Sequence, residues 1–528
     1  ATGAPSASPL APTTPLPAFV LTTANLRSGP GLTYPIVAAI AAGQQVLPLA
    51  RNQAGDWIQL DMAGEGQVWI AAFLLDLPVG LDLPLAANIP PPPALPGDMV
   101  QFSQSTIQLP TYPREPFTTP AYDPTYAWEM QRFDRAAFTA ANPQPQPQSY
   151  RLFVLENRWL KLTFLPQWGG RVYQMIFKPT GSNELYQNRV IKPSPWGPEQ
   201  QGLGWAAVGG IEWGYPVPEH GYAWGEAWSH ITQPRPPAYG LILFDRGQER
   251  VHAAVEVGMQ PDSAAFTLDI LLENPTAAAL PVSFWLNAML APGPANSVGP
   301  ELRFLYPMSQ ARVHSTGESD LPGADGIFAW PRHQGREVDR LGTWQRWLGF
   351  FAHPQAQADW AAVYDTAADE GVVRIFPRQA APGLKGFGFG FSDAIPADLY
   401  TDDGSRYVEM HGGLTPTFAE ALTLAPGGMR TWRETWYPVA GIGGITQADA
   451  RGAAHLTRAE AGWRLQLFSV TSLSGELQVS GPAGELLRRS VSLDPARPLD
   501  LLLPASEGPL SFELRPASGP AWRMTGLG

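Results

Sequence analysis

The chain has 528 residues, a formal net charge of −12 at pH 7, 56 prolines, 53 glycines and only 16% charged residues. Proline and glycine favour turns, and few charged residues are available for the ion pairs of surface helices, so the composition predicts an all-β protein. At roughly 150 residues per domain, the length predicts about three or four domains. Without Lys/Arg clusters, cysteine or an apolar run near the roughly 20 residues of a membrane span, the sequence argues against nucleic acid, disulfides and a membrane span.

Residues 1–17 are a tract of Pro, Ser, Thr and Ala that cannot bury enough apolar surface to fold. Such a tract is typical of a stalk that remains after an export signal has been removed. It predicts an extracellular or cell-surface protein, and the competing explanation is an ordinary disordered terminus.

Residues 18–76 break into short apolar runs separated by glycine-containing turns, which predicts a small β-barrel. Residues 25–31 (NLRSGPG), 55–57 (GDW) and 68–70 (VWI) are similar to bacterial Src-homology-three-type modules. That resemblance implies a module that tethers the protein to a cell-wall or surface partner and has no chemistry of its own. Tryptophans at these positions of the family commonly serve the barrel core, so Trp57 and Trp69 are not assigned to a ligand.

Residues 77–103 contain PPPP and PG, and this composition predicts a stiff linker. The next domain is expected to span residues 104–445 and to begin with an extended arm. We expect a short helix around residues 128–138 and a polar Pro/Gln spacer at residues 142–148.

From residue 149 onward the chain alternates apolar and polar positions in many short runs rich in β-branched and aromatic residues. With turn signals between the runs and no helical period, the pattern predicts a large antiparallel sandwich. Residues 446–528 change in composition and contain about seven short strand candidates, which predict a small C-terminal β-sandwich without a ligand motif.

Several motifs occur in a fixed order between residues 106 and 444: LENRWLKLTFLPQWGGRVYQM, GGIEW, WLN at residues 285–287, TDDGSRYVE at residues 401–409 and WYPV at residues 436–439. In this order they resemble the galactose-mutarotase-like (aldose-epimerase) superfamily, and more narrowly an uncharacterised bacterial branch of it, a domain of unknown function. The resemblance implies a β-supersandwich whose concave face holds a carbohydrate site.

The segment at residues 209–230, GGIEWGYPVPEHGYAWGEAWSH, combines acids, histidines and tryptophans on a backbone rich in Gly and Pro. Indole rings can cover the apolar faces of a sugar while carboxylates exchange protons with its oxygens. The segment therefore predicts one wall of a carbohydrate site. The alternative is that its aromatic residues belong to a core and that its acids are solvated.

The family resemblance implies an acid and a base, with a histidine that protonates the ring oxygen and a late glutamate that accepts the anomeric proton. Glu409, two residues before His411, matches that glutamate in order and context. The asparagine–histidine signature of the epimerases is missing, which leaves His220 and His230 as candidates for the acid.

Glu212 offers a second interpretation, because desolvation beside Trp213 is expected to raise its pKa and to keep it protonated. Glu212 and Glu409 would then form the carboxylate pair of a glycoside hydrolase. In such enzymes a separation of roughly 5 Å favours retention and one of roughly 6.5 to 9.5 Å favours inversion.

Other residues are predicted to support the site by binding hydroxyls, stacking on sugar rings or orienting charges. The predicted catalytic residues are Glu212, Glu409 and His220, and the predicted substrate-binding residues are Arg171, Trp213, Trp224, Trp228, His230, Asn287, Asp402, Tyr407 and His411. For each supporting residue, a core or turn role is the alternative. No spaced Asp/Asn loop, HxH or HxxxH motif occurs, so neither a metal nor another cofactor is expected.

These observations leave three functions open for a carbohydrate-directed protein. Glycoside hydrolysis by Glu212 and Glu409 ranks first, and epimerisation of an aldose by Glu409 with His220 or His230 ranks second. The third is glycan binding or surface assembly without catalysis.

Overall fold

The computed structural model describes residues 16–31, 34–53, 55–62, 66–78, 81, 83–90, 99–196, 202–245, 247–392 and 395–528. Residues 1–15 of the expected stalk and residues 91–98 of the expected linker lie outside this described part. The chain divides into two compact units, Ala1–Pro93 and Ala94–Gly528. The predicted all-β class is confirmed, and no helix of the described residues is long and apolar enough to cross a membrane.

The first unit contains two antiparallel sheets, with strand orders β4-β1-β8 and β3-β2-β7-β6-β5. The strands are β1 (Ala18–Val20), β2 (Ala24–Arg27), β3 (Ile36–Ile40), β4 (Gln45–Val46), β5 (Pro48–Arg51), β6 (Trp57–Met62), β7 (Gly66–Ala71) and β8 (Leu75–Asp76), and the 3-10 turn η1 spans Ala72–Leu74. Trp57 and Trp69 are buried in an apolar cluster of this unit. The assignment to a bacterial Src-homology-three-type module stays a prediction.

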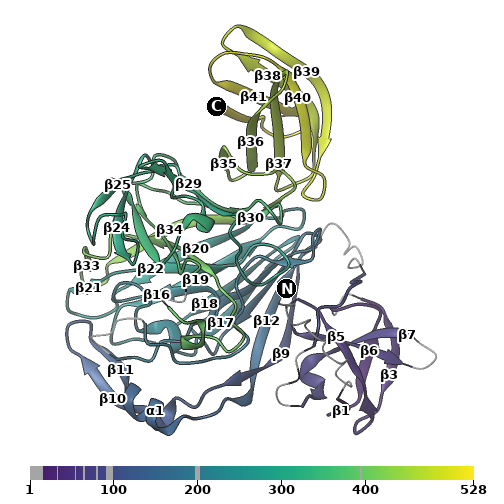
Figure 1. The fold of residues 1–528 in the computed structure, drawn as a ribbon. Helices are drawn as coiled ribbons and strands as arrows, with labels where there is room; N and C mark the ends of the chain where they lie inside the picture. Colours follow the sequence, from purple (N-terminus) through teal and green to yellow (C-terminus); the bar gives the residue numbers. More distant parts are fainter. Residues whose placement is uncertain are drawn as a thin grey trace, which may run out of the picture. The chain divides into compact units, whose positions relative to one another are not determined.

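The second unit is built on two large antiparallel sheets (Figure 1). The 12-stranded sheet has the order β25-β24-β28-β31-β32-β22-β16-β14-β13-β12-β9, with β15 beside β14. Its strands are β9 (Gln101–Thr111), β12 (Gln146–Glu156), β13 (Leu160–Leu165), β14 (Arg171–Phe177), β15 (Ser182–Asn183), β16 (Gly210–Gly214), β22 (Trp285–Leu290), β24 (Gln310–Thr316), β25 (Ile327–Ala329), β28 (Leu348–His353), β31 (Gly383–Gly388) and β32 (Val408–Gly413).

The 8-stranded sheet has the order β17-β18-β19-β20-β34-β30-β29-β23. Its strands are β17 (Ser229–Arg235), β18 (Ala238–Phe244), β19 (His252–Met259), β20 (Phe266–Glu273), β23 (Leu302–Leu305), β29 (Trp360–Asp365), β30 (Glu370–Ile375) and β34 (Met429–Ala440). Shorter elements are the pairs β21 (Leu280–Val282) with β33 (Leu422–Leu424) and β26 (Arg332–His333) with β27 (Arg336–Glu337), and the 3-10 turns η4 (Ala223–Gly225), η5 (Leu341–Thr343) and η6 (Ala397–Leu399).

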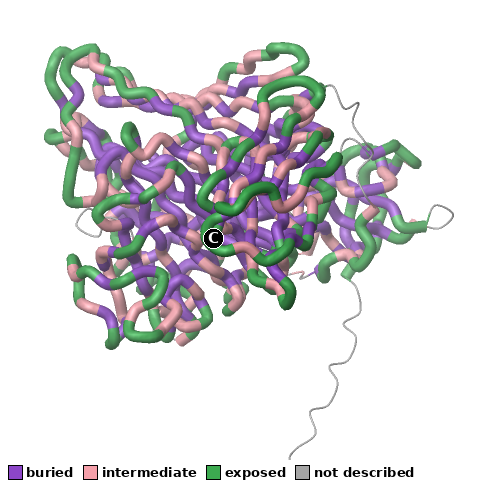
Figure 2. Tube along the Cα trace, turned by 90° about the horizontal axis from the view of Figure 1, so that it is seen from above, coloured by how far each residue is buried: buried purple, intermediate pink, exposed green. Residues whose placement is uncertain are grey.

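The two large sheets differ in how deeply their strands are buried. Strands β19 and β20 alternate buried and half-buried residues, as in a sheet with one face on the core. Strands β16, β22 and β32 are buried at every residue. Figure 2 shows that many buried residues lie on the inside of the chain, whereas exposed residues gather in the outer loops. Both faces of these three strands are covered, and they nevertheless carry charged and amide side chains.

The expected helix around residues 128–138 is wrong in its first half. Trp128–Phe133 forms strand β11, which pairs with β10 (Thr118–Asp123), and the helix α1 spans Arg135–Ala141. Burial of Trp128, Met130 and Phe133 against the core favours the strand, and the Asp134 side chain caps the helix by accepting a hydrogen bond from Ala137 N–H. A 3-10 turn, η2 (Glu115–Phe117), precedes the hairpin.

Residues after the large sheets form two four-stranded sheets, β35-β36-β37-β40 and β39-β38-β41-β42. Their strands are β35 (Gln447–Asp449), β36 (Gly452–Ala459), β37 (Gly462–Ser469), β38 (Leu473–Gly481), β39 (Gly484–Leu493), β40 (Leu499–Pro504), β41 (Leu510–Pro516) and β42 (Trp522–Leu527). An apolar cluster that includes Leu477, Phe512 and Trp522 fills the space between them. The expected strand-rich C-terminal region is therefore present, with eight strands in the two sheets rather than about seven.

A buried carboxyl group makes the stability of the large unit depend on pH. Burial and the neighbouring charge of Glu370 raise the pKa of Glu184 well above its usual value. The stabilisation from protonated Glu184 is complete below its unfolded-chain pKa and is lost as the pH rises towards the folded one. In that window one extra proton on the folded protein lowers the free energy of unfolding by about 1.4 kcal/mol per pH unit.

We expect Glu184→Gln to remove this component of the slope, because the amide donates a hydrogen bond without titrating. Urea denaturation from pH 5 upward measures it, with Glu507→Gln on the exposed surface as the control. If the free energy of unfolding changed with pH equally in the wild type and in Glu184→Gln across this range, the raised pKa of Glu184 would be contradicted.

Candidate active site

Neighbouring strands of the 12-stranded sheet bring polar side chains into one row. In the strand register, Glu212 on β16 faces Asn287 on β22. Asn287 in turn faces His411 on β32, and His411 faces Lys385 on β31. Residues directly opposite on paired strands project to the same face, and Glu409 shares that face because it lies two residues before His411. Positions far apart in the sequence therefore meet in one buried row.

Glu409 lies at the centre of this arrangement. Its Oε1 accepts a hydrogen bond from Asn287 Nδ2 at 3.1 Å, and its Oε2 lies 2.9 Å from His411 Nε2 and 3.9 Å from Lys385 Nζ. Burial alone would raise the pKa of Glu409, but the hydrogen bond from His411 and the charge of Lys385 outweigh burial and lower it. Glu409 is therefore a buried carboxylate that stays ionised.

His411 supports Glu409 as a neutral ring. Burial and the charge of Lys385 lower the pKa of His411 to about 4, although Glu409 opposes this shift. Its Nε2 also lies 3.1 Å from Lys385 Nζ. Burial likewise lowers the pKa of Lys385, against the opposing charges of Glu409 and Glu219.

Glu212 and His220 form a second buried pair. Glu212 Oε1 lies 2.5 Å from His220 Nδ1, while Oε2 accepts a hydrogen bond from Trp205 Nε1 at 3.2 Å and lies 3.3 Å from an Arg171 guanidinium nitrogen. The His220 ring stacks on the Trp205 indole, with 3.7 Å between ring centroids. Glu212 thus has a partner at each oxygen, and His220 is held on both a face and an edge.

The charge state of this pair corrects the expectation for Glu212. Burial raises its pKa, but the charge and hydrogen bond of His220, together with Arg171, reverse the effect and lower it. Burial alone would lower the pKa of His220, but the charge and hydrogen bond of Glu212 raise it. The raised pKa that was predicted for Glu212 is therefore wrong, since its partners lower it, and His220 is the member of the pair whose pKa is raised.

The loop that carries His220 needs its glycines. Gly221 has φ +63°, and a Cβ there would lie 2.1 Å from Tyr215 N, so the loop closes on itself without space for a side chain. Glu219 also adopts a positive φ, +63°. This fold turns His220 towards Glu212 and Glu219 towards His314.

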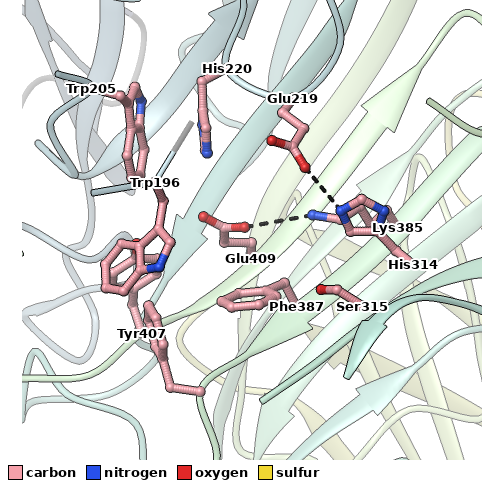
Figure 3. A pocket seen from close by; sticks show the side chains of 11 residues that line it. Trp196, Trp205, Glu219, His220, His314, Ser315, Lys385, Phe387, Tyr407 and Glu409 are labelled. Carbon is pink, nitrogen blue, oxygen red and sulfur yellow. Dashed lines mark hydrogen bonds and ion pairs between the residues drawn. The ribbon is translucent and has the colours of Figure 1, made fainter. Parts of the chain in front are cut away.

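A cavity of about 420 Å³ lies beside these groups. We call its two sides the charged wall, which is Glu219, His314, Ser315 and Lys385, and the aromatic wall, which is Trp196, Trp205, Phe387, Phe389 and Tyr407. Figure 3 shows His220 and Glu409 between the two walls, with Trp196, Trp205 and Tyr407 on one side and Lys385, His314 and Ser315 on the other.

The charged wall is internally paired. Glu219 Oε1 lies 2.9 Å from His314 Nε2. Burial would raise the pKa of Glu219, but the hydrogen bond from His314 and the charge of Lys385 lower it to about 2. Glu219 is therefore an ionised hydrogen-bond acceptor. Within the described ranges no group of three or more His, Asp or Glu side chains is arranged to hold a metal ion.

Several predicted site residues lie at the cavity or directly behind it. Glu409, His220 and Tyr407 line it, and Asn287 and His411 contact Glu409. Arg171 was predicted to orient a carboxylate or a sugar ring oxygen. Its guanidinium contacts Glu212 and also donates to backbone carbonyls of Trp168, Gly209 and Trp224, and it does not line the cavity.

Other predicted residues lie elsewhere. Trp213, Trp224 and Trp228 are buried in the main core, and none of them lines the cavity. His230 packs on Phe153 with 4.1 Å between ring centroids. Asp402 is an exposed acid that accepts hydrogen bonds from Lys192 and Tyr112. The indoles at the cavity are instead Trp196 and Trp205.

Sequence reasoning missed most of both walls, including Trp196, Trp205, His314, Ser315 and Lys385. Lys385 carried a usable signal, since it is one of only four lysines and stands in the apolar, glycine-rich run GLKGFGFGF. An isolated lysine in a buried strand needs a partner or a function. The other missed residues have no local signal.

The two histidines should titrate differently. We expect NMR of 15N-histidine-labelled protein at pH 6 to show His220 protonated and His411 neutral, because Glu212 raises the pKa of His220 whereas burial and Lys385 lower that of His411. Glu212→Gln should lower the pKa of His220 by removing its main stabilising charge. Neutral His220 at pH 6 in the wild type would contradict this charge assignment.

Comparison with known proteins identifies a family and several similar folds. The sequence model of the domain of unknown function DUF5107 matches residues 131–439, more than half of the chain. Of the solved structures, a TPR-domain containing protein from Parabacteroides distasonis is 23% identical with a TM-score of 0.53, and the match covers 64% of this chain and 55% of that protein. At this identity the likeness shows a shared fold.

Weaker likenesses extend to galactose mutarotase-like proteins. One from Clostridium acetobutylicum is 11% identical with a TM-score of 0.40, covering 55% of this chain and 96% of the other. A galactose mutarotase related enzyme from Lactobacillus acidophilus is 11% identical with a TM-score of 0.36, covering 55% and 97%. These values are too low to transfer residues or roles, so the chemistry has to be argued from the cavity.

Proposed function

We propose that this protein, which belongs to the DUF5107 family, interconverts the anomers of an aldose, with His220 as the acid and Glu409 as the base. The observation that carries the proposal is a histidine, held by a buried carboxylate, that lines a cavity together with a second buried carboxylate, Glu409, and an aromatic wall. Glu212 occupies His220 Nδ1, which leaves Nε2 on the cavity side (Figure 3).

In this reaction His220 donates its Nε2 proton to the ring oxygen while Glu409 accepts the proton of the anomeric hydroxyl. The bond between C1 and the ring oxygen breaks, and C1 becomes an aldehyde carbon. After rotation of the aldehyde, the ring hydroxyl attacks the other face, and each proton returns to the group that supplied it. No cofactor or covalent intermediate is required.

The ionisation states support this assignment of roles. An acid must carry its proton at working pH, and Glu212 raises the pKa of His220. A base must be free of its proton, and His411 with Lys385 lowers the pKa of Glu409. Trp205 assists by stacking on His220 and by donating to Glu212, which fixes the orientation of the acid.

Glycoside hydrolysis by Glu212 and Glu409 has less support. A hydrolase acid needs a raised pKa and access to the leaving oxygen. Glu212 has a lowered pKa and lies behind His220, with its oxygens committed to His220, Trp205 and Arg171.

The decisive experiment follows the optical rotation of freshly dissolved aldoses at pH 6, where spontaneous anomerisation is slow. We expect wild-type protein to accelerate the approach to equilibrium and His220→Asn to lower kcat by about 10²- to 10⁴-fold, the usual contribution of a general acid. His230→Asn, a histidine outside the cavity, is the matched control and should retain activity. Aldose binding without acceleration would instead indicate a glycan-binding protein, and release of sugar from glycosides would indicate a hydrolase.

A further inference from the structure

The two walls of the cavity offer very different partners to a sugar hydroxyl. The charged wall presents a carboxylate, an ammonium group, an imidazole and a hydroxyl from Glu219, Lys385, His314 and Ser315. Among the described residues of the aromatic wall, ring carbons dominate, because Phe387 and Phe389 have no polar side-chain atom and Trp205 Nε1 is already bonded to Glu212. Only the Tyr407 hydroxyl and the Trp196 indole nitrogen remain polar there.

The acid and base fix the direction of a pyranose between these walls, a step that rests on the proposed function. The ring oxygen must lie at His220 and the anomeric hydroxyl at Glu409. Trp205 of the aromatic wall stacks on His220, at 3.7 Å between centroids, whereas Lys385 Nζ of the charged wall lies 3.9 Å from Glu409 Oε2. The ring atom beyond C1 is C2 and the ring atom beyond the ring oxygen is C5.

C2 and its hydroxyl therefore lie towards the charged wall. Glu219 stays ionised there, so it accepts hydrogen bonds from hydroxyls, while Lys385 and Ser315 can donate. A sugar without the C2 hydroxyl would lose these charge-assisted hydrogen bonds to the charged wall, although the wall's own pairs, such as Glu219 with His314, would remain. The analogue that lacks the group should therefore bind less well.

C5 and its exocyclic C6 lie towards the aromatic wall. Lys385 Nζ lies 5.5 Å from the Phe387 ring centroid, but no described lysine or arginine lies over the rings of Trp196, Trp205, Phe389 or Tyr407. A carboxylate or phosphate on C6 that packs on these four rings would be buried without such a partner, which is costly. A C6 hydroxyl would lose water in exchange for ring carbons, whereas a methyl group gains from the same contact.

We infer that the substrate is a 6-deoxyhexose, whose C6 methyl packs on the aromatic wall and whose C2 hydroxyl binds the charged wall. The hydroxyl at C2 and the methyl at C6 are then the two specificity determinants. Phe389 is the ring of this wall chosen to test the methyl contact, since it lines the cavity and stacks on Tyr400 with 5.0 Å between ring centroids.

The test compares anomerisation rates of D-galactose, 6-deoxy-D-galactose, 2-deoxy-D-galactose and D-galacturonate, followed by NMR at equal protein concentration. We expect kcat/KM for the 6-deoxy sugar to exceed that for galactose by roughly tenfold, within the modest range available to an apolar pocket that meets an added hydroxyl. The 2-deoxy sugar should fall well below galactose, and galacturonate should be the poorest substrate. Equal or better turnover of galactose than of its 6-deoxy form would overturn the inference.

Two variants assign the effects to the walls. Phe389→Tyr adds a hydroxyl to the aromatic wall and should narrow the preference for the 6-deoxy sugar, while Glu219→Gln should narrow the penalty for the 2-deoxy sugar. Phe389→Tyr should leave the ratio of kcat/KM for 2-deoxy-D-galactose and D-galactose near its wild-type value. Glu219→Gln should do the same for the ratio of 6-deoxy-D-galactose to D-galactose. A general loss of folding would not change one ratio and spare the other. Failure to accelerate any of the four sugars would refute the proposed function itself, whereas activity with the reverse order would refute only the 6-deoxy assignment.

Discussion

Glu409→Gln should lower kcat for anomerisation by about 10²- to 10⁴-fold, the range measured for loss of a positioned general base. The amide keeps the shape of the side chain and its contact with Asn287, but it cannot accept the proton of the anomeric hydroxyl. Polarimetry at saturating sugar measures kcat. Because the neutral amide still binds hydroxyls, KM should change much less than kcat.

A matched control is Glu226→Gln, in the same loop region as His220 but outside the cavity. Burial raises the pKa of Glu226 to about 7, against the opposing charge of Arg250, so it is largely protonated at pH 6 and the amide is a close mimic. We expect its activity to stay within about threefold of wild type. A Glu409→Gln protein with wild-type kcat would refute the assignment of the base.

The pH profile gives an independent reading of the same pair. The base works only above the lowered pKa of Glu409, so activity should persist well into the acidic range. The acid works only below the raised pKa of His220, so activity should fall as the pH rises through that value.

Much of the fold could be predicted from the sequence because alternation and turn residues are local signals. The strand-rich region after residue 149 and the family motifs gave the sandwich and located Glu409 in a strand. The hairpin strand at Trp128–Phe133 was missed, because its pairing with Thr118–Asp123 and the burial of Trp128 decide the conformation and neither is local.

The site was only half predictable, because the strand register assembles it. Glu409 was recognised from the order of the motifs along the chain, and His220 from the many acids, histidines and tryptophans in its segment. Lys385 joins them only because β31 pairs with β32. Trp213, Trp224 and Trp228 share a segment with Glu212 but are buried in the main core. The number of aromatic residues in a segment does not tell which of them point into the core and which point into a cavity.

The error at Glu212 has a physical cause. Desolvation does raise the pKa of a buried carboxyl group, but a cation in contact acts in the opposite direction. His220 and Arg171 both touch Glu212, and their combined effect exceeds that of burial. The partners of a buried acid decide its charge, and the sequence did not reveal them.

Glu434→Gln should destabilise the large unit by about 3 to 5 kcal/mol, the usual cost of leaving one member of a buried ion pair alone. Arg374 and Glu434 are both fully buried, and the carboxylate accepts two hydrogen bonds from the guanidinium at 2.7 Å each. It also accepts from the indoles of Trp432 and Trp436. The amide removes the charge that compensates Arg374, and the midpoint of urea denaturation measures the loss.

The neighbouring strand β20 supplies the control, and strand β32 links the buried pair to the site. Arg433, next to Glu434, pairs with Asp269 on the exposed side, so Asp269→Asn should cost less than about 1 kcal/mol. A Cβ on Gly412 would lie 2.1 Å from the Arg374 guanidinium, so this ion pair packs directly against the strand that carries Glu409 and His411. We therefore expect Glu434→Gln to lower activity as well as stability, while Asp269→Asn leaves activity unchanged and costs less than about 1 kcal/mol of stability. Equal denaturation midpoints for the two variants would show that the buried pair contributes no more than the exposed one.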